Sequence, residues 1–420
     1  MSKNTQQTLD PWATAVKLYE KTLKSQQKAD TLIDEAFSGQ DPVSRRRCQY
    51  LFLGALRHKL RLEHALDRLI DKRPRPRLWA LLTIAAFELT EAEIIPKVVD
   101  HAVRQAKELL NEKEVALVNA VLRKTPNQLK RLPRDLATRY SHPRWLVKSW
   151  ESVWGTPNTE KLLQWNQEPA PAYLRLRDPN LIKNPPTFLK ATQWPTFFEV
   201  KPASWDKAEA LLKAGKAYSQ DPSTRGAVDL LKVKPGEQVL DLCAAPGGKS
   251  LYLSEALAGN NNSCLVSLDL PGKRLERLYE NIRKISGIRT KVVEHDLLSL
   301  EFSTLAEHKL PTSYDAVLLD APCSNTGVIR RRPDVRWRLS PQEIAQVSKL
   351  QFELLEKATE FVKKGGRLVY STCSLEPKEN KKLIQAFLKE YPNWECLEEK
   401  INTPWENNCD GAGAFLLQEC

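Results

Sequence analysis

Residues 239–250 read Val-Leu-Asp-Leu-Cys-Ala-Ala-Pro-Gly-Gly-Lys-Ser, a pattern that indicates the fold class of the second half of the chain. Four residues of strand character run into a tight turn with two adjacent glycines, and a helix can begin directly after them. A strand, a glycine turn and a helix form the first unit of a nucleotide-binding α/β sheet, in which glycine lets a ligand approach the backbone. Such a turn is a weak signal alone, so the flanking sequence has to support it.

Short apolar runs alternate with longer amphipathic helices in the sequence that follows Pro235. The runs are 238–244, 264–270, 291–295, 314–320 and 367–372. Helical periodicity fills intervals between them, as in 273–285 and 342–363. This alternation predicts right-handed βαβ crossovers and a parallel sheet.

The N-terminal third has a different character. Apolar residues recur at helical spacing over 12–124, and 78–89 is apolar nearly all round, as expected of a helix in the middle of a bundle. The stretch that follows contains many prolines and mixes short helical and strand-like pieces. We therefore expect an all-α domain over 1–135, a small α/β connector over 136–215 and an α/β catalytic domain over 216–420.

The charge of the chain is concentrated at its N-terminal end. The chain has 64 Lys and Arg against 52 Asp and Glu, a net charge of +12. Residues 1–150 hold 28 basic and 17 acidic residues, so almost the whole surplus lies there. A basic domain attracts polyanions by releasing their counterions, which makes a nucleic acid the natural partner. A solvated basic surface without a partner is the alternative that charge alone leaves open.

The sequence predicts neither a membrane span nor a metal site. The longest apolar stretch is too short to cross a bilayer, and residues 1–10 lack the charged and apolar pattern of a secretory signal. The eight cysteines, at 48, 243, 264, 323, 373, 396, 409 and 420, contain no C-x-x-C pair. We expect a cytoplasmic protein whose thiols stay reduced and free for chemistry.

Acidic residues at strand ends favour an adenosyl ligand. Asp269 ends the second strand, where a carboxylate can hold the hydroxyls of a ribose. Asp296 follows the third strand and suits an adenine amino group. No phosphate-binding G-x-x-x-x-G-K-[ST] motif is present, so a triphosphate is disfavoured. Helix capping is the alternative role for Asp269, and the neighbouring His295 is expected to be a bystander.

Two cysteine segments carry the chemistry. Residues 319–327 read Leu-Asp-Ala-Pro-Cys-Ser-Asn-Thr-Gly, and 371–374 read Ser-Thr-Cys-Ser. Cys323 and Cys373 thus follow neighbouring strands, at the sheet edge where open α/β folds bind ligands. A thiolate that adds to carbon 6 of a cytosine activates carbon 5 for methylation, while an acid assists at N3. Asp320 suits the acid role if its pKa is raised.

At these residues the chain resembles the RNA (cytosine-5)-methyltransferases, in particular the bacterial 16S ribosomal RNA methyltransferases of the RsmB (Sun or Fmu) type. The resemblance covers nearly the whole chain. It rests on 241–249, 320–338 and 370–377, on Tyr-Ser-Gln-Asp-Pro-Ser-Thr at 218–224, and on Leu-Val-Asn-Ala-Val-Leu-Arg at 117–123, which is similar to NusB-like RNA-binding domains.

This resemblance implies a NusB-like helical domain, the connector, and a Rossmann-like methyltransferase domain with an antiparallel strand near 414–418. It implies S-adenosylmethionine as the cofactor. The expected cofactor-binding residues are Cys243, Ala244, Ala245, Pro246, Gly247, Gly248, Lys249, Asp269, Asp296 and Asp320. It also makes Cys373 the nucleophile and Cys323 the residue that assists product release, a choice that the chemistry alone leaves open.

The chain departs from the family pattern at two places. Arg332 stands where a histidine is expected, and residues 410–415, Asp-Gly-Ala-Gly-Ala-Phe, lack the aromatic residues that usually follow Asp-Gly. The arginines directly after the first cysteine segment are expected to grip RNA phosphates beside an extruded base, with Trp337 stacking on it. These RNA-binding candidates are Arg330, Arg331, Arg332 and Arg336.

The resulting hypothesis is a monomeric methyltransferase that modifies carbon 5 of a cytosine in RNA, with 16S ribosomal RNA as the expected substrate. The same chemistry on transfer RNA is one alternative, and only the NusB-like helices favour ribosomal RNA. A non-catalytic RNA-binding or assembly factor is the other. The two cysteines, Asp320 and the glycine turn argue against a scaffold, which has no need of them.

Overall fold

The computed structural model describes residues 10–37 and 41–420. The chain forms two compact units. The first contains 1–169 together with the short segment Ile329–Arg338, and the second contains Ala170–Val328 and Leu339–Cys420. The stretch in which we expected no secretory signal, residues 1–10, lies almost wholly outside the described residues. Within the described residues, no helix is long and apolar enough to cross a membrane.

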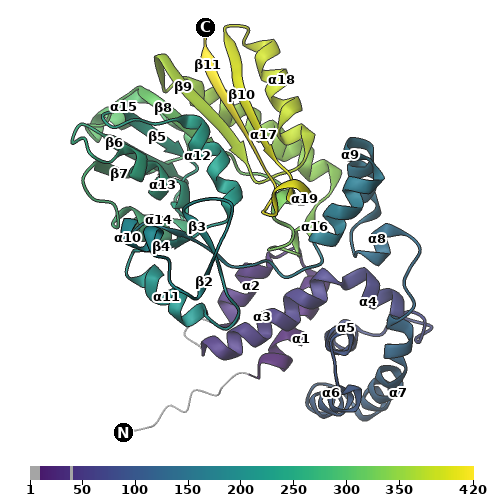
Figure 1. Cartoon of the computed structure of the whole chain (residues 1–420). Helices are drawn as coiled ribbons and strands as arrows, with labels where there is room; N and C mark the ends of the chain where they lie inside the picture. The colour runs from purple at the N-terminus through teal and green to yellow at the C-terminus, as the bar shows by residue number, and fades with distance from the viewer. Residues whose placement is uncertain (1–9, 38–40) are drawn as a thin grey trace. The chain divides into compact units, whose positions relative to one another are not determined.

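The first unit is all-α (Figure 1). Its helices are α1 (Pro11–Lys24), α2 (Ala29–Ala36), α3 (Pro42–Arg57), α4 (Lys59–Leu66), α5 (Pro76–Thr90), α6 (Ile95–Leu109), α7 (Glu112–Leu129), α8 (Leu136–Arg139), α9 (Arg144–Trp165) and α16 (Val335–Arg338). Helix α5 is buried on nearly every side, as the apolar run 78–89 predicts. Asn111 begins α7 with a reciprocal capping box, in which the backbone N–H of Glu114 donates to Asn111 Oδ1 at 3.0 Å. Such a cap stabilises a helix by about 1 kcal/mol.

The second unit is built on a seven-stranded mixed sheet. Its strands are β5 (Gln238–Leu242), β6 (Cys264–Asp269), β7 (Arg289–Glu294), β8 (Tyr314–Asp320), β9 (Val362–Thr372), β10 (Trp394–Asn402) and β11 (Ala412–Glu419). They lie in the order β10-β11-β9-β8-β5-β6-β7, with β5 to β9 parallel and the two C-terminal strands antiparallel. The strand order reverses between β5 and β8, which is where open α/β sheets bind their ligands.

Helices cover both faces of this sheet (Figure 1). They are α12 (Arg225–Leu231), α13 (Gly248–Leu257), α14 (Arg274–Ile282), α15 (Phe302–Glu307), α17 (Pro341–Thr359), α18 (Lys381–Glu390) and the short α19 (Pro404–Asn407). Leu240 and Leu242 point to the face that α17 and α18 cover, while Val239, directly before them, points to the face that α12 and α13 cover. Both faces are apolar, as expected for parallel strands buried on two sides.

The expected connector over 136–215 is not a separate unit. Helices α8 and α9 belong to the helical unit, and the strands that follow belong to the second. They are β1 (Tyr173–Leu176), β2 (Leu189–Ala191), β3 (Phe197–Val200) and β4 (Ala217–Ser219), a small antiparallel sheet with α10 (Pro179–Lys183) and α11 (Trp205–Lys213) beside it. The fully buried Arg175 of β1 explains the grouping, because it forms an ion pair with Glu255 of α13 and donates to Gln220 at 2.8 Å. The division therefore falls at 169/170 instead of at 135/136 and 215/216.

Candidate active site

The loop 243–249 connects β5 to α13 and lies at the carboxyl edge of the sheet. It is held by its neighbours: the backbone N–H of Ala245 donates to Asp269 Oδ2 at 2.7 Å, and Asn281 Nδ2 donates to Pro246 O at 2.7 Å. Gly247 has a φ of 96°, and a Cβ at Gly248 would lie 2.7 Å from the ring of Tyr218. The glycines are thus required by backbone conformation and by packing inside the protein, a reason that adds to the ligand approach we expected.

Asp241 lies beneath this loop in a buried position. Its Oδ2 accepts from Ser250 Oγ, while its Oδ1 is buried without a hydrogen-bond partner. Burial raises the pKa of Asp241 to about 7, against the lowering effect of the Ser250 hydrogen bond, and the nearby charge of Asp320 adds to the rise. The orphaned oxygen leaves one acceptor beneath the candidate cofactor loop that no protein group uses.

The two acidic residues expected to bind an adenosyl group differ in exposure. Asp269 is buried, and besides Ala245 it accepts from the backbone N–H of Leu270 at 2.8 Å, so part of its role is structural. Asp296 is exposed and caps the short 3₁₀ helix η2 (Leu297–Ser299), accepting from Leu298 N at 3.1 Å. Each carboxylate retains acceptor capacity, because an ionised carboxylate has about four lone-pair sites.

Lys249 and Asp320 form an ion pair at the switch point of the sheet. Lys249 Nζ donates to Asp320 Oδ2 at 2.6 Å, and Ser371 Oγ donates to Asp320 Oδ1 at 2.9 Å. Burial alone would lower the pKa of Lys249, but the charge and hydrogen bond of Asp320 outweigh burial, so the pKa is raised and the ammonium is retained. The sequence placed Lys249 only in the cofactor loop, whereas the structure also brings it beside the cysteines.

The two predicted cysteines meet. Cys323 Sγ and Cys373 Sγ are 3.1 Å apart, and Cys373 Sγ donates to Asn325 Oδ1 at 3.3 Å. Hydrogen bonding with Cys373, then burial, raises the pKa of the Cys323 thiol well above its usual value. Cys323 is therefore a protonated thiol next to Cys373. Asn325 belongs to the quoted segment 319–327, yet its contact with Cys373 has no signal in the sequence alone.

Glu379 accepts hydrogen bonds from both cysteine segments, a role that the sequence analysis did not predict. This carboxylate is fully buried in the 3₁₀ helix η4 (Pro377–Glu379). It accepts from Ser324 N at 2.8 Å, from Ser374 Oγ at 2.7 Å, from Gln351 Nε2 at 3.0 Å and from Ser324 Oγ. A buried carboxylate is tolerated only where donors surround it, and here the donors come from both segments. Glu379 thus fixes Cys323 and Cys373 relative to each other.

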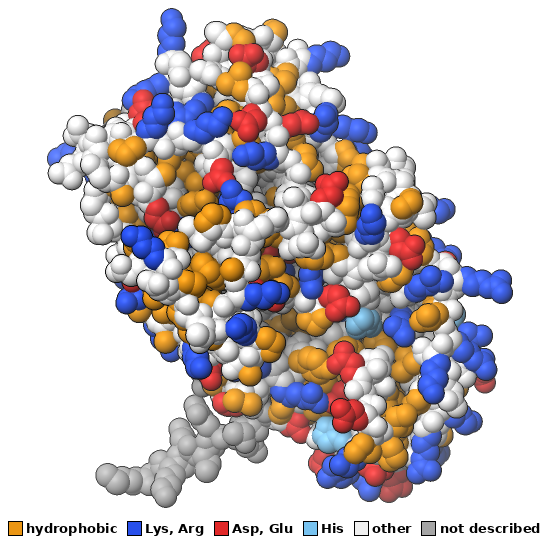
Figure 2. Space-filling view, viewed as in Figure 1, with side chains coloured by type: hydrophobic (Ala, Val, Ile, Leu, Met, Phe, Trp, Pro, Cys, Tyr) orange, Lys and Arg blue, Asp and Glu red, His pale blue; other side chains and the backbone are white. Residues whose placement is uncertain are grey.

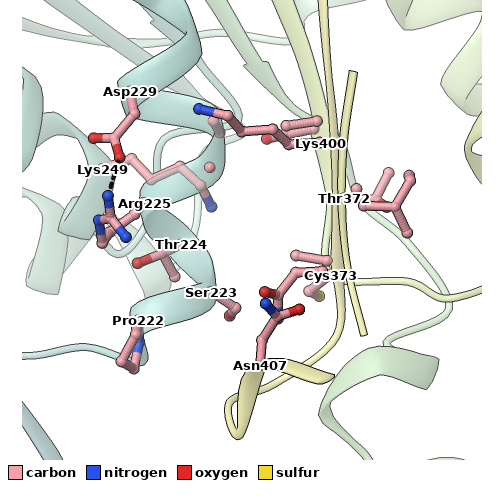
Figure 3. Close-up of a pocket in the computed structure, with 18 of the residues that line it drawn as sticks. Pro222, Ser223, Thr224, Arg225, Asp229, Lys249, Thr372, Cys373, Lys400 and Asn407 are labelled. Atoms are coloured by element: carbon pink, nitrogen blue, oxygen red, sulfur yellow. Dashed lines mark hydrogen bonds and ion pairs between the residues drawn. The ribbon is translucent and has the colours of Figure 1, made fainter. Parts of the chain in front are cut away.

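A cavity of about 480 Å³ opens beside Cys373 (Figure 3). Arg225 and Asp229 of α12, which form an ion pair at 2.7 Å, line one wall, and Lys400 of β10 reaches into the cavity from the opposite wall. The ammonium of Lys249 points into the space between the walls (Figure 3). Cations, a thiol and an apolar lining suit a planar base attached to an anionic backbone.

The altered C-terminal stretch forms part of this cavity. Ala412, Gly413 and Ala414 line it at the beginning of β11. A Cβ at Gly413 would lie 2.2 Å from Asn380 Oδ1, and Asn380 also accepts from Thr372 Oγ1 at 2.8 Å, next to Cys373. Gly413 therefore has no room for a side chain, and the wall of the cavity at this point is formed by small residues.

The arginine cluster does not form the open phosphate grip that we expected. Arg336 is fully buried and donates to Ser141 O at 3.0 Å and to Asn166 O at 3.1 Å, so it is not available to RNA. Arg330 donates to Glu168 O at 3.2 Å and stacks on Trp165.

The other members of this cluster also lie in the helical unit. Arg331 is half-buried, and Arg332 is exposed but 3.4 Å from Asp30. Trp337 is held within the helical unit, because its indole N–H donates to Leu56 O at 2.8 Å and its ring packs on the helical core, in place of the stacking role that we expected. Arg336 and Trp337 are corrections to the sequence analysis.

Within the described residues, no group of three or more His, Cys, Asp or Glu side chains could hold a metal ion. His295 is half-buried, and its Nδ1 lies 2.8 Å from Asp296 O.

Two family models match the chain. The model described as "16S rRNA methyltransferase RsmB/F" matches residues 228–414, and the model of the NusB family matches residues 5–126. The second match confirms that the N-terminal helices are NusB-like. The first includes the candidate thiols, the Lys249–Asp320 pair and most of the lining of the cavity.

Known proteins are similar over most of the chain. "Ribosomal RNA small subunit methyltransferase B" of Citrobacter koseri is 31% identical over 82% of this chain and 82% of its own length. A crystal structure titled PH0851 covers 98% of this chain and 99% of that chain with a TM-score of 0.77 at 23% identity, which confirms the fold. NSun6 from Pyrococcus horikoshii, solved with SFG, covers 66% of this chain and 98% of that chain with a TM-score of 0.54 at 17% identity.

Proposed function

Because the chain belongs to the ribosomal RNA small subunit methyltransferase B family, we propose that it transfers a methyl group from S-adenosylmethionine to carbon 5 of a cytosine in small-subunit ribosomal RNA. The observation that carries the proposal is the 3.1 Å approach of the Cys323 and Cys373 sulfurs beside the Lys249–Asp320 pair. A non-catalytic RNA-binding factor has no use for this arrangement.

The residues around the cofactor loop fit S-adenosylmethionine. The orphaned Asp241 Oδ1 and the exposed carboxylate of Asp296 are acceptors with capacity to spare, and residues 243–249 lie at the carboxyl end of β5. Asp269 would meet the ribose hydroxyls through lone pairs that its two backbone donors leave unused. When bound, S-adenosylmethionine supplies an electrophilic methyl group. SFG, with which the P. horikoshii protein was solved, is an analogue of this cofactor.

Cys373 acts as the nucleophile in this proposal. Its thiol first loses its proton to solvent. The thiolate then adds to carbon 6 of the cytosine, and the electron pair of the C5–C6 double bond moves to carbon 5. Asp320 accepts from the N4 amino group, and the Lys249 ammonium donates to N3 or O2 of the ring. This divides the task that we first gave to Asp320 alone, because both carboxylate oxygens of Asp320 already accept hydrogen bonds, from Lys249 and from Ser371.

Cys323 acts after the methyl group is in place. Its thiol has a raised pKa because it hydrogen bonds with Cys373. Once the Cys373 sulfur is bonded to carbon 6, that hydrogen bond is lost, and the Cys323 thiol releases its proton to solvent to become a thiolate. It can then accept the proton from carbon 5, so that the C6–S bond breaks and Cys373 leaves as a thiolate.

The helical unit supplies exposed cations for RNA. Lys and Arg side chains are prominent on the edge of this unit formed by α7 and α8 (Figure 2). The exposed basic residues of this stretch are Lys113, Arg123, Lys124, Lys130, Arg131 and Arg134. We assign the phosphate contacts to this basic edge, defined by these six residues, in place of Arg336. Such contacts position RNA without reading its sequence.

The test compares two single substitutions. Cys373→Ala should abolish methylation of small-subunit ribosomal RNA and form no adduct. Cys323→Ala should leave the protein covalently attached to RNA that contains ordinary cytosine, visible as a slower band in a denaturing gel. Adduct formation by Cys373→Ala instead would reverse the two roles, and full methylation by both variants would refute the proposal. Transfer RNA in parallel reactions distinguishes the two RNA classes.

A further inference from the structure

The segment Ile329–Arg338 begins six residues after Cys323 and is built into the helical unit. Three of its side chains hold it there. Arg336 donates to Ser141 O and Asn166 O, Trp337 donates to Leu56 O, and Asp334 Oδ2 accepts from the backbone N–H of Ala29 at 3.2 Å. In return, Arg57 donates to the carbonyl oxygen of Arg330 at 3.1 Å. We call Ile329–Arg338 the anchor segment.

Among these residues, Arg336 depends most strongly on its hydrogen-bond acceptors. It is fully buried, and its hydrogen-bond acceptors are backbone carbonyls of Ser141 and Asn166, with His142 Nδ1 at 3.4 Å. A guanidinium in such a position is stable only while those acceptors stay in place, because a buried charge without hydrogen bonds is very costly. The planar guanidinium group of Arg336 can donate to two carbonyl groups at once, whereas a lysine ammonium does not have this geometry.

The residues that precede the anchor segment belong to the candidate active site. Asn325 contacts Cys373 Sγ, and Asn325 Nδ2 donates to Cys323 O at 2.7 Å. Gly327, in the 3₁₀ helix η3 (Thr326–Val328), donates from its backbone N–H to Cys373 O at 3.0 Å. The loop 323–328 is therefore held beside Cys373 through Asn325 and Gly327, and it continues directly into the anchor segment.

We propose that Arg336 is a positioning residue, which fixes the loop that carries Cys323 by locking the anchor segment into the NusB-like helical unit. The inference rests on the proposed function for its catalytic consequence. A variant that lacks the Arg336 contacts should therefore show the catalytic defect of a Cys323 variant, to a smaller extent.

The first experiment needs neither RNA nor cofactor. Iodoacetamide alkylation of the free full-length protein, followed by peptide mass spectrometry, reports the accessibility of each thiol. Arg336→Met should raise the alkylation rate of Cys323 by about tenfold, a change that corresponds to about 1.4 kcal/mol. Cys264, fully buried in β6, should stay unreactive and shows that the second unit remains folded. An unchanged rate at Cys323 overturns the inference.

Two variants control for loss of stability. Leu122→Ala removes a fully buried side chain of α7 and weakens the helical unit without touching the anchor segment. It should leave Cys323 alkylation unchanged, and an equal increase would show that any destabilisation has this effect. Trp337→Phe removes one hydrogen bond of the anchor segment and should shift alkylation in the same direction as Arg336→Met, to a smaller extent. It serves as the test if Arg336→Met does not fold.

The second experiment measures turnover. Arg336→Met should lower kcat more than it raises KM for RNA, and it should accumulate the covalent adduct seen with Cys323→Ala. Arg336→Lys keeps the positive charge but lacks the planar guanidinium group, so it should show the same loss of kcat and the same accumulation of adduct. If Arg336 were a phosphate contact, Arg336→Lys would behave as wild type and Arg336→Met would reduce the salt slope of RNA binding by about one. Failure of Cys323→Ala to form an adduct counts against the proposed function, whereas the alkylation result stands independently.

Discussion

Glu379→Gln removes the charge that joins the two cysteine segments while keeping the shape of the side chain. Four hydrogen bonds converge on its two carboxylate oxygens. A glutamine amide can keep two of them on its oxygen, and it presents an NH₂ group to the remaining donors. Hydrogen bonds to a charged group are worth about 1.5–3 kcal/mol each, so we expect a loss of about 3–5 kcal/mol.

Thermal unfolding followed by circular dichroism measures this loss. For a domain of this size, a loss of that magnitude lowers the midpoint by roughly 5–15 °C. The rate of methyl transfer to RNA should fall at temperatures where the variant is still folded, because Ser324 and Ser374 no longer fix the neighbouring cysteines. Glu390→Gln, an exposed glutamate on α18, is the matched control and should change neither quantity. A Glu379→Gln protein with wild-type midpoint and rate would refute this account of the carboxylate.

Two further predictions concern pH and salt. Burial raises the pKa of Asp241 to about 7, so the folded state binds this proton more tightly than the unfolded state does. The proton on Asp241 therefore stabilises the folded state by up to about 4 kcal/mol. This contribution is complete below about pH 4 and is lost as pH rises through about 7. In Asp241→Asn, the free energy of unfolding measured in urea should vary less with pH over that range. Replacing Lys130, Arg131 and Arg134 by glutamine should weaken RNA binding and lower its log–log salt slope by about two, since each lost contact with single-stranded RNA removes about 0.7. Unchanged slopes, or a pH profile of Asp241→Asn that follows wild type, would contradict these assignments.

The sequence was sufficient for the large sheet because its strands are buried on both faces. The runs 264–270 and 314–320 match β6 and β8 to within one residue, since a short continuous apolar stretch bounded by polar residues is typical of a strand that is covered on two sides. The meeting of Cys323 and Cys373 also followed from the sequence, because parallel strands end at one edge. The antiparallel β10 was missed, since an edge strand with three acidic residues lacks the apolar pattern of a buried strand.

Contacts between distant residues could not be read from the sequence. Arg336 occupies a buried position because carbonyl groups of Ser141 and Asn166 accept from it, and those residues precede it by more than 150 positions. A run of arginines has the same sequence pattern whether its side chains face solvent or buried carbonyl groups. Glu379 poses the same difficulty, because only the fold reveals that its donors come from two separate loops.

The proposed mechanism requires the Cys373 sulfur to bond to carbon 6 of the target base. Incubation of the wild-type protein with cofactor and RNA containing 5-fluorocytosine stops the reaction after methyl transfer, because the fluorine on carbon 5 cannot leave as a proton would. Digestion and mass spectrometry then identify the modified peptide. We predict a methylated fluorocytosine on the peptide that contains Cys373, whereas attachment at Cys323, or no attachment at all, would contradict the mechanism.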